Sequence, residues 1–204
     1  VYNSGTKIVE GPGAGSDTVQ AAVSYTVGKG VYIQVLETTN AKGTAPISLY
    51  SNEFGQKVIG NAGNNSLRGY GGNDTIYGGA GDDRISGGPG NDVLAGNTGA
   101  DTYYFSYALN EATNVDTIKG FSGIDLISLS SAIFTKAGPV GKLAASAFVA
   151  NASGQATSAA HRIIYETDTG ILRYDPDGTG AAAAVKFAIM DGMPAMNAGD
   201  FVIA

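Results

Sequence analysis

The sequence predicts an all-β fold whose central part is a flattened coil of short parallel strands. Glycine is concentrated in residues 60–104, which contain 13 of the 31 glycines and divide without a gap into five blocks of nine residues. The flanks alternate short apolar runs, such as residues 6–9, 17–19 and 31–35, with turn residues. We therefore divide the chain into an N-terminal β segment (1–44), the coil (45–104) and a C-terminal β-rich cap (105–204).

The five blocks keep the same residue types at the same positions. From Gly60 onward they read GNAGNNSLR, GYGGNDTIY, GGAGDDRIS, GGPGNDVLA and GNTGADTYY. Positions 1 and 4 are always glycine, which permits left-handed backbone angles and a close approach of neighbouring chains. Position 6 carries Asn65 and then four aspartates (Asp74, Asp83, Asp92, Asp101), and position 8 carries a large side chain that faces inward. A flexible linker does not require the same residue types at a fixed nine-residue spacing, so the pattern argues against a linker.

Each block predicts one loop and one short strand, so that two blocks make one full coil. Coils stack at the strand spacing of about 4.8 Å. Each loop therefore lies beside the loop two blocks further along the chain. Val58 and Leu49 continue the nine-residue step upstream of Leu67, but their blocks lack the Gly-x-Asp loop. They predict a continuation of the coil without bound metal.

Composition and charge exclude several classes of function. The net charge is −6, which argues against a nucleic-acid partner and favours small cations. The absence of Cys and the single His rule out disulfides, thiolate zinc sites and multi-His catalytic metal sites. No nucleophile elbow, phosphate loop or membrane-length apolar run is found in the sequence. We therefore expect no enzyme activity within these residues and no membrane span.

The repeated pattern, Gly-Gly-x-Gly-x-Asp-x-aliphatic-x, resembles the calcium-binding nonapeptide of RTX proteins. The resemblance implies a right-handed parallel β-roll with at least three Ca²⁺ ions between loops of the same side. Each ion takes the carbonyls of positions 2 and 4 and the Asp from one loop, and the carbonyls of positions 1 and 3 and the Asp from the loop two blocks on. The implied ligands are Asn61, Gly63, Asn65, Gly78, Ala80 and Asp83 in the first site, Tyr70, Gly72, Asp74, Gly87, Pro89 and Asp92 in the second, and Gly79, Gly81, Asp83, Gly96, Thr98 and Asp101 in the third. Gly88 and Gly90 supply the carbonyls of positions 2 and 4 in the fourth block.

These assignments carry three expectations. The first site is weaker, because Asn65 replaces an aspartate. Asp83 serves two sites and Asp101 serves one, so alanine at position 83 should raise the calcium requirement for folding more than alanine at position 101. The repeats should be unfolded at low calcium, because their few inward side chains do not offset the cost of ordering the loops.

The cap contains two further resemblances. Residues 116–129 resemble the segment that closes the roll in serralysin-type proteases and alginate-epimerase calcium modules, although Gly120 and Ser128 stand where that family has Asp. Asp116 and Asp125 are accordingly further candidate metal ligands, with turn and strand capping as the alternative. Residues 159–204 resemble the serralysin-type C-terminal domain and predict a hairpin of residues 162–165 and 171–174.

The last five residues, Asp200, Phe201, Val202, Ile203 and Ala204, resemble an uncleaved type I secretion signal. A terminal edge strand is the alternative. As a signal, this end should stay free for the exporter, and deletion of Phe201 to Ala204 should leave the calcium-bound fold almost unchanged.

Taken together, the sequence predicts the calcium-binding module of a secreted bacterial protein, located outside the cell or on its surface. Its partners are calcium and a type I exporter. Two rival functions remain open. One is a structural surface protein that self-associates. The other is a calcium-dependent polysaccharide-binding module, which the 11 tyrosines favour.

Overall fold

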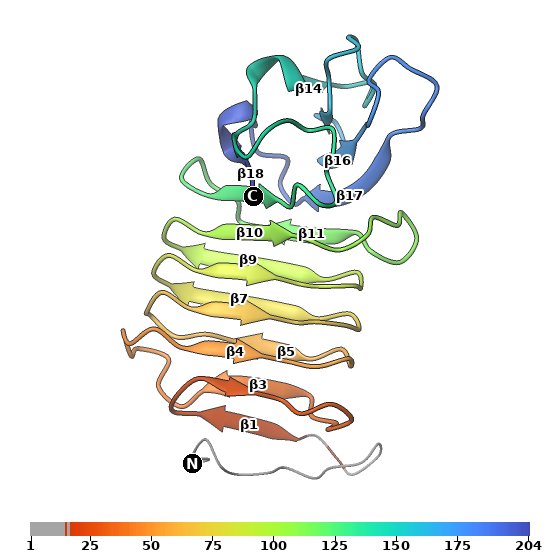
Figure 1. The fold of residues 1–204 in the computed structure, drawn as a ribbon. Coiled ribbons are helices and arrows are strands. Elements are labelled where there is room, and N and C mark those ends of the chain that lie inside the picture. Colours follow the sequence, from red (N-terminus) through yellow and green to blue (C-terminus); the bar gives the residue numbers. More distant parts are fainter. Residues whose placement is uncertain (1–14, 16) are drawn as a thin grey trace.

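A computed structural model describes residue 15 and residues 17–204, and these residues are almost entirely β. Successive coils stack from β1 towards the cap, which lies over the far end of the stack (Figure 1). Two short 3-10 helices, η1 (Ala145–Ala147) and η2 (Ala198–Asp200), lie in the cap. The strand predicted at residues 6–9 lies outside the described residues. Across the described part of the chain, no helix is long and apolar enough to cross a membrane.

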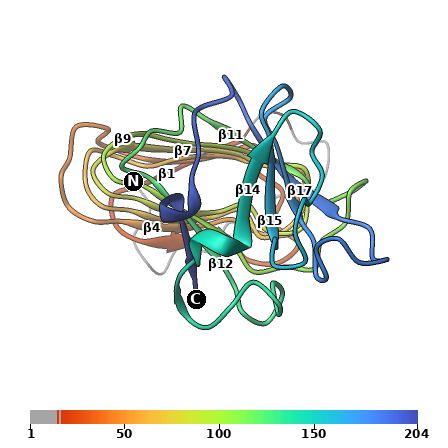
Figure 2. The same cartoon turned by 90° about the horizontal axis from the view of Figure 1, so that it is seen from above.

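The strands form two sheets that face each other across a flattened ring (Figure 2). The larger sheet contains, in spatial order, β1 (Thr18–Ala21), β3 (Val35–Thr38), β5 (Lys57–Ile59), β7 (Thr75–Ala80), β9 (Val93–Thr98), β11 (Asp116–Lys119), β17 (Val185–Met190), β16 (Ile171–Tyr174), β15 (Ile163–Glu166) and β14 (Phe148–Asn151). The smaller contains β13 (Gly141–Lys142), β18 (Phe201–Ile203), β12 (Leu126–Leu129), β10 (Thr102–Phe105), β8 (Arg84–Ser86), β6 (Ser66–Arg68), β4 (Ser48–Tyr50) and β2 (Tyr25–Thr26). The sequence-based prediction of an all-β fold with a parallel β-roll is confirmed.

The strand register confirms that loops stack two blocks apart. Within the repeats, Ser66 pairs with Arg84 and Thr75 pairs with Val93, which is a step of two blocks. At the end of the repeats the step becomes longer, because Val93 pairs with Thr117 and Thr102 pairs with Leu126. One longer loop, residues 106–115 before β11, lengthens both steps, but the parallel pairing continues through it.

Position 8 of each block builds the core of the roll. Its side chains (Leu67, Ile76, Ile85, Leu94, Tyr103) are at most 1 % exposed. Leu49 and Val58 extend this stack upstream, as predicted, and both are fully buried. The strands of residues 18–38 join the same two sheets, so neither sheet is interrupted near residues 44 and 45. The strand predicted at 31–35 is shifted, since β3 begins at Val35.

The cap adds mixed strands to the end of the roll. β15 and β16 form the predicted antiparallel hairpin, in which Ile163 pairs with Tyr174. β16 pairs antiparallel with β17, and β17 pairs in parallel with β11, so the hairpin extends the larger sheet. The cap is thereby hydrogen-bonded directly to the last coil.

The end of the chain differs from both sequence-based expectations. β18 lies between β12 and β13, so it is neither a free tail nor an edge strand. Phe201 and Ile203 are buried, and Asp200 forms a capping box with Asn197 at η2. The expectation that deleting these residues leaves the fold almost unchanged is therefore wrong, because the deletion removes a buried strand.

Candidate metal centre

The carboxylates of the repeats form two columns, one along each edge where the loops stack. The first column contains Asp74, Asp92 and Asp116, and the second contains Asp83, Asp101 and Asp125. Every one of these side chains is at most 4 % exposed. Buried carboxylates in a row are unfavourable unless hydrogen bonds or cations compensate them.

One oxygen of each carboxylate is held by the coil below it. In the first column, the Oδ1 atoms of Asp74, Asp92 and Asp116 accept from the backbone N–H of Gln56, Asp74 and Asp92 at 2.7, 2.7 and 3.1 Å. In the second, the Oδ1 atoms of Asp83, Asp101 and Asp125 accept from Asn65, Asp83 and Asp101 at 2.7, 2.9 and 2.9 Å. Asp116 and Asp125 thus continue the columns, although the longer loop 106–115 separates both of them from their partners.

The second oxygen has no such partner in the repeats. The Oδ2 atoms of Asp74, Asp83, Asp92 and Asp101 are buried and accept no hydrogen bond. Each lies against the glycine at position 1 of its own block, where a Cβ on Gly69, Gly78, Gly87 or Gly96 would collide with it. Four buried oxygens with partial or full negative charge are therefore unsatisfied. The Oδ2 of Asp125, in contrast, accepts from the backbone N–H and the hydroxyl of Ser122 at 2.7 and 3.0 Å.

The glycines bring backbone carbonyls of stacked loops into contact. A Cβ on Gly88 would collide with the Tyr70 carbonyl oxygen, and a Cβ on Gly90 would collide with that of Gly72. Both glycines have a positive φ, whereas the position-1 glycines do not. The left-handed angles expected at positions 1 and 4 thus occur at positions 2 and 4 of the second to fifth blocks. Position 1 requires glycine because the aspartate occupies the space beside it.

Burial controls the protonation of the columns. Burial, followed by the charge of a neighbouring aspartate, raises the pKa of Asp74 to about 8 and that of Asp83 to about 7. Burial likewise raises the pKa of Asp92 to about 6, and it raises the pKa values of Asp101 and Asp116. Without a cation, burial thus makes the charged form of these carboxyl groups less favourable in the folded columns than in the unfolded chain.

The donor set fits a calcium ion. Within residues 15 and 17–204, no three His, Asp or Glu side chains converge on one point, so main-chain carbonyls must complete any cation site. Two carboxylates together with carbonyl oxygens are hard ligands of the kind that Ca²⁺ takes in flexible geometry. The unsatisfied Oδ2 atoms mark four positions, between Asp74 and Asp92, Asp92 and Asp116, Asp83 and Asp101, and Asp101 and Asp125. At these positions Ca²⁺ would neutralise two carboxylates and join adjacent coils.

The three predicted ligand sets differ in how the structure arranges them. The loops of the second and third predicted sites lie on neighbouring coils, joined by the Asp74 N–H to Asp92 Oδ1 and the Asp83 N–H to Asp101 Oδ1 bonds. Gly88 and Gly90 lie against the carbonyls of Tyr70 and Gly72, and the ligation of calcium by these residues stays a prediction. The first predicted site differs, because the Asn65 side-chain amide donates to the carbonyls of Asn61 and Gly63. Those two carbonyls thus have a side-chain donor within their own block, where the other blocks carry an aspartate with an unsatisfied Oδ2.

A second, exposed ladder was missed in the sequence. The side-chain Oδ1 atoms of Asn64, Asn73 and Asp82 accept from the backbone N–H of Asp82, Asn91 and Ala100, two blocks further on, at 2.8–2.9 Å. These residues occupy position 5, directly before the column residue. The recurrence of Asn and Asp at position 5 was visible in the five blocks and could have indicated this ladder.

Stacked parallel coils whose loops carry two columns of unsatisfied carboxylates define a parallel β-roll of the cation-binding class. The family model of the RTX calcium-binding nonapeptide repeat (4 copies) matches residues 50–85, 59–94 and 77–105. Residues 50–105 are thus RTX calcium-binding nonapeptide repeats. The match does not extend over the cap, where the serralysin-type resemblance stays a prediction. No curated protein matches the chain.

The pKa values predict how calcium binding depends on pH. The folded-state pKa values of Asp74, Asp83 and Asp92 lie above the unfolded value of 3.8, so their protonation stabilises the calcium-free fold at low pH. This stabilisation is lost as the pH rises through about 6 to 8. Calcium must displace the protons, and we expect its affinity to increase over the same range. Calorimetry in buffers of different ionisation enthalpy should show proton release at pH 6.5, and release of no protons would contradict the protonated columns.

Proposed function

We propose that this module binds four calcium ions, two in each column, and that its repeats fold on them outside the cell. The observation that carries the proposal is the set of four buried Oδ2 atoms without a partner. A carboxylate oxygen in that position destabilises the fold when charged, and a bound cation turns the same oxygen into a stabilising ligand. Calcium is therefore coupled to the folding of the repeats. The module serves as a folding and binding unit rather than as an enzyme.

The proposed location follows from calcium concentration. Extracellular calcium modules have dissociation constants of about 10⁻⁴–10⁻³ M, far above cytosolic calcium. The repeats would stay unfolded in the cytosol, pass through a type I exporter, and fold on reaching calcium. Residues 200–204 serve as the export signal in this proposal. Because β18 is buried in the folded cap, the exporter must engage this segment before folding.

Calcium stoichiometry tests the first part of the proposal. Titration of the chain with Ca²⁺ should show four ions bound, one for each unsatisfied Oδ2 atom, together with a rise in β-sheet ellipticity. Mg²⁺ should not substitute, because it demands octahedral geometry and retains its waters. An unchanged spectrum on adding Ca²⁺ would contradict calcium-coupled folding.

Export can be tested separately from folding. In a host with a type I system, a chain lacking residues 201–204 should no longer reach the medium. Phe148→Ala provides the control, because Phe148 contacts the Phe201 ring at 5.5 Å between centroids and its loss weakens the same packing while the terminus stays intact. This variant should still be exported. Undiminished export of the truncated chain would remove the signal assignment.

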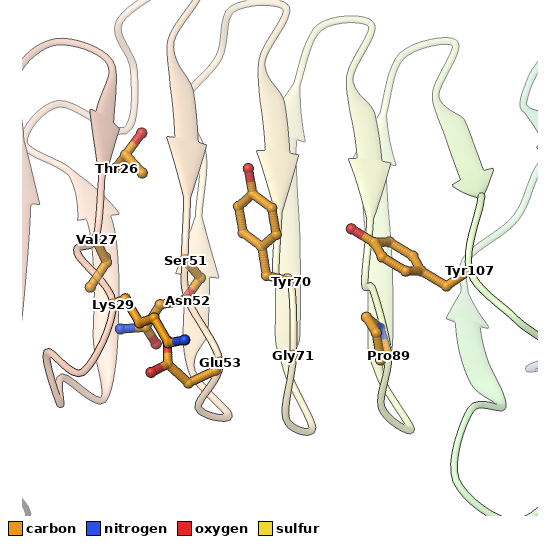
Figure 3. Close-up of a pocket in the computed structure, with 10 residues that line it drawn as sticks. All are labelled: Thr26, Val27, Lys29, Ser51, Asn52, Glu53, Tyr70, Gly71, Pro89 and Tyr107. Carbon is orange, nitrogen blue, oxygen red and sulfur yellow. The ribbon is translucent and has the colours of Figure 1, made fainter.

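A groove along the loops favours polysaccharide binding as a second candidate function. It has a volume of about 440 Å³ and is lined by Tyr70, Pro89, Tyr107, Lys29 and Glu53, among others. Tyr70, Pro89 and Tyr107 lie on loops that follow successive strands of the smaller sheet, so that two tyrosine rings flank a proline (Figure 3). Aromatic faces with charged groups beside them suit a ligand that is partly apolar and partly hydroxylated. The backbone of Tyr70 and Pro89 belongs to a calcium loop, so we expect this binding to require calcium.

Binding to immobilised polysaccharides, measured with and without calcium, tests the groove. Tyr107→Ala, and Tyr70→Asn, which suits the positive φ of 66° at Tyr70, should each reduce calcium-dependent binding. Tyr77→Ala is the control, because Tyr77 lies on β7 in the other sheet, where Lys57 packs over its ring. Equal loss in all three variants, or no binding by the unmodified chain, would contradict this candidate function.

A further inference from the structure

The lower ends of the two columns contain amides instead of aspartates. Asn65 occupies the column position below Asp83, and Gln56 occupies the one below Asp74. The Oδ1 of Asn65 accepts from the Ile47 N–H at 3.2 Å, just as each aspartate Oδ1 accepts from the coil below it. This bond fixes the orientation of the amide, because only its oxygen can face an N–H group. The Asn65 Nδ2 therefore stands where the aspartates have their unsatisfied Oδ2.

The amide nitrogen of Asn65 donates hydrogen bonds to carbonyl oxygens of the kind that a calcium ion would otherwise coordinate. It donates to the Gly63 carbonyl at 2.5 Å and to the Asn61 carbonyl at 3.4 Å. Both asparagines are 3 % exposed, so water does not compete for these carbonyls. The two carbonyls belong to positions 2 and 4 of the block, whose equivalents in the next blocks are the calcium ligands implied by the repeat pattern. Here a neutral donor satisfies them at no cost in buried charge.

The other column ends in a similar network. Gln56 Nε2 donates to Asn52 Oδ1 at 2.7 Å, and the Ser51 hydroxyl donates to Gln56 Oε1. Asn52 Nδ2 donates in turn to the carbonyls of Gly28 and Val31 at 2.9 and 2.7 Å. All three side chains of this Ser51–Gln56 network are buried. Within residues 17–68, no buried side-chain N or O atom lacks a partner, whereas four do in the coils directly above.

We propose that these amides take the place of calcium in the lower coils, so that residues 17–68 fold without calcium. In this inference, which rests on the proposed calcium-coupled folding of the repeats, the lower coils form a preformed base. The Asp-bearing coils of residues 69–129 are then ordered on this base when calcium binds. The fully buried Leu36, Leu49, Val58 and Leu67 supply the apolar core of the base.

Hydrogen exchange of the full chain, followed by mass spectrometry with calcium and with a chelator, tests the base. With calcium, amides of both regions should be protected. With the chelator, residues 69–129 should lose protection while residues 17–68 keep it. Loss of protection in residues 17–68 to the same degree overturns this inference and leaves calcium-coupled folding intact. Full protection of both regions without calcium overturns calcium-coupled folding as well.

Asn65→Asp provides a gain-of-site test. The new carboxylate places an oxygen opposite the Asn61 and Gly63 carbonyls, so the chain should bind one calcium ion more and the base should lose protection in the chelator. Asn64→Asp is the matched control, because Asn64 is exposed one residue earlier and its Oδ1 accepts from the Asp82 N–H at 2.9 Å, which an aspartate can also do. The control should bind no additional ion. An unchanged stoichiometry and unchanged chelator protection in Asn65→Asp would overturn the assignment of Asn65 as a calcium substitute.

Discussion

Asp101→Ala is expected to raise the calcium concentration at which the repeats fold more than Asp83→Ala does. Asp101 contributes to two proposed sites, one with Asp83 and one with Asp125. Asp83 contributes to one, because the Asn65 amide occupies the position below it. At a hundredfold excess of calcium over the dissociation constant, each ion lost costs about 2.7 kcal/mol of folding free energy. This order is the reverse of the one that the sequence predicted, where Asn65 was counted as a ligand.

The first column provides an internal repeat of this experiment. Asp92 lies between Asp74 and Asp116 and contributes to two proposed sites. Asp74 contributes to one, because Gln56 and not an aspartate lies below it. Asp92→Ala should therefore shift the calcium midpoint more than Asp74→Ala. Calcium titrations followed by circular dichroism measure all four variants under identical conditions. Equal midpoints within each pair, or a larger shift for Asp83 and Asp74, would contradict the assignment of four sites.

Phe201→Ala is expected to destabilise the calcium-bound cap by about 3–5 kcal/mol, the usual cost of truncating a buried phenylalanine. The Phe201 side chain is fully buried and packs against the Phe148 ring. Its strand β18 lies between β12, which extends the roll, and β13 in the cap. The substitution therefore leaves a cavity where the cap joins the roll.

Thermal unfolding in saturating calcium measures this effect. Val202→Ala is the control, because Val202 lies on the same strand but is only half-buried. The melting temperature of Phe201→Ala should fall well below that of the control. A melting temperature equal to that of the unmodified chain would show that β18 is not part of the folded cap in solution.

The repeats were predictable because their information is local and periodic. A nine-residue step placed Leu67, Ile76, Ile85 and Leu94 in the core, and all four are buried there. The same step extended the coil upstream to Leu49 and Val58. The hairpin of residues 163–174 was predictable for a similar reason, since its turn lies between two short apolar runs.

The sequence by itself determined the parallel coil, its two-block register, its core side chains and the two columns of aspartates, because each depends on residue types at fixed spacing. Only the tertiary structure decided which carboxylate oxygens lack a partner, since the partner comes from the neighbouring coil, two blocks or more away in the chain. It placed Asp116 and Asp125 at the ends of the columns across the longer loop 106–115. It also placed the Ile47 N–H of the neighbouring coil on the Asn65 Oδ1, which turns the Asn65 amide nitrogen towards the carbonyls of its own block. It also buried Phe201 between two strands, β12 and β13, that come much earlier in the chain. Such partners are set by stacking and sheet order, which short-range spacing does not encode.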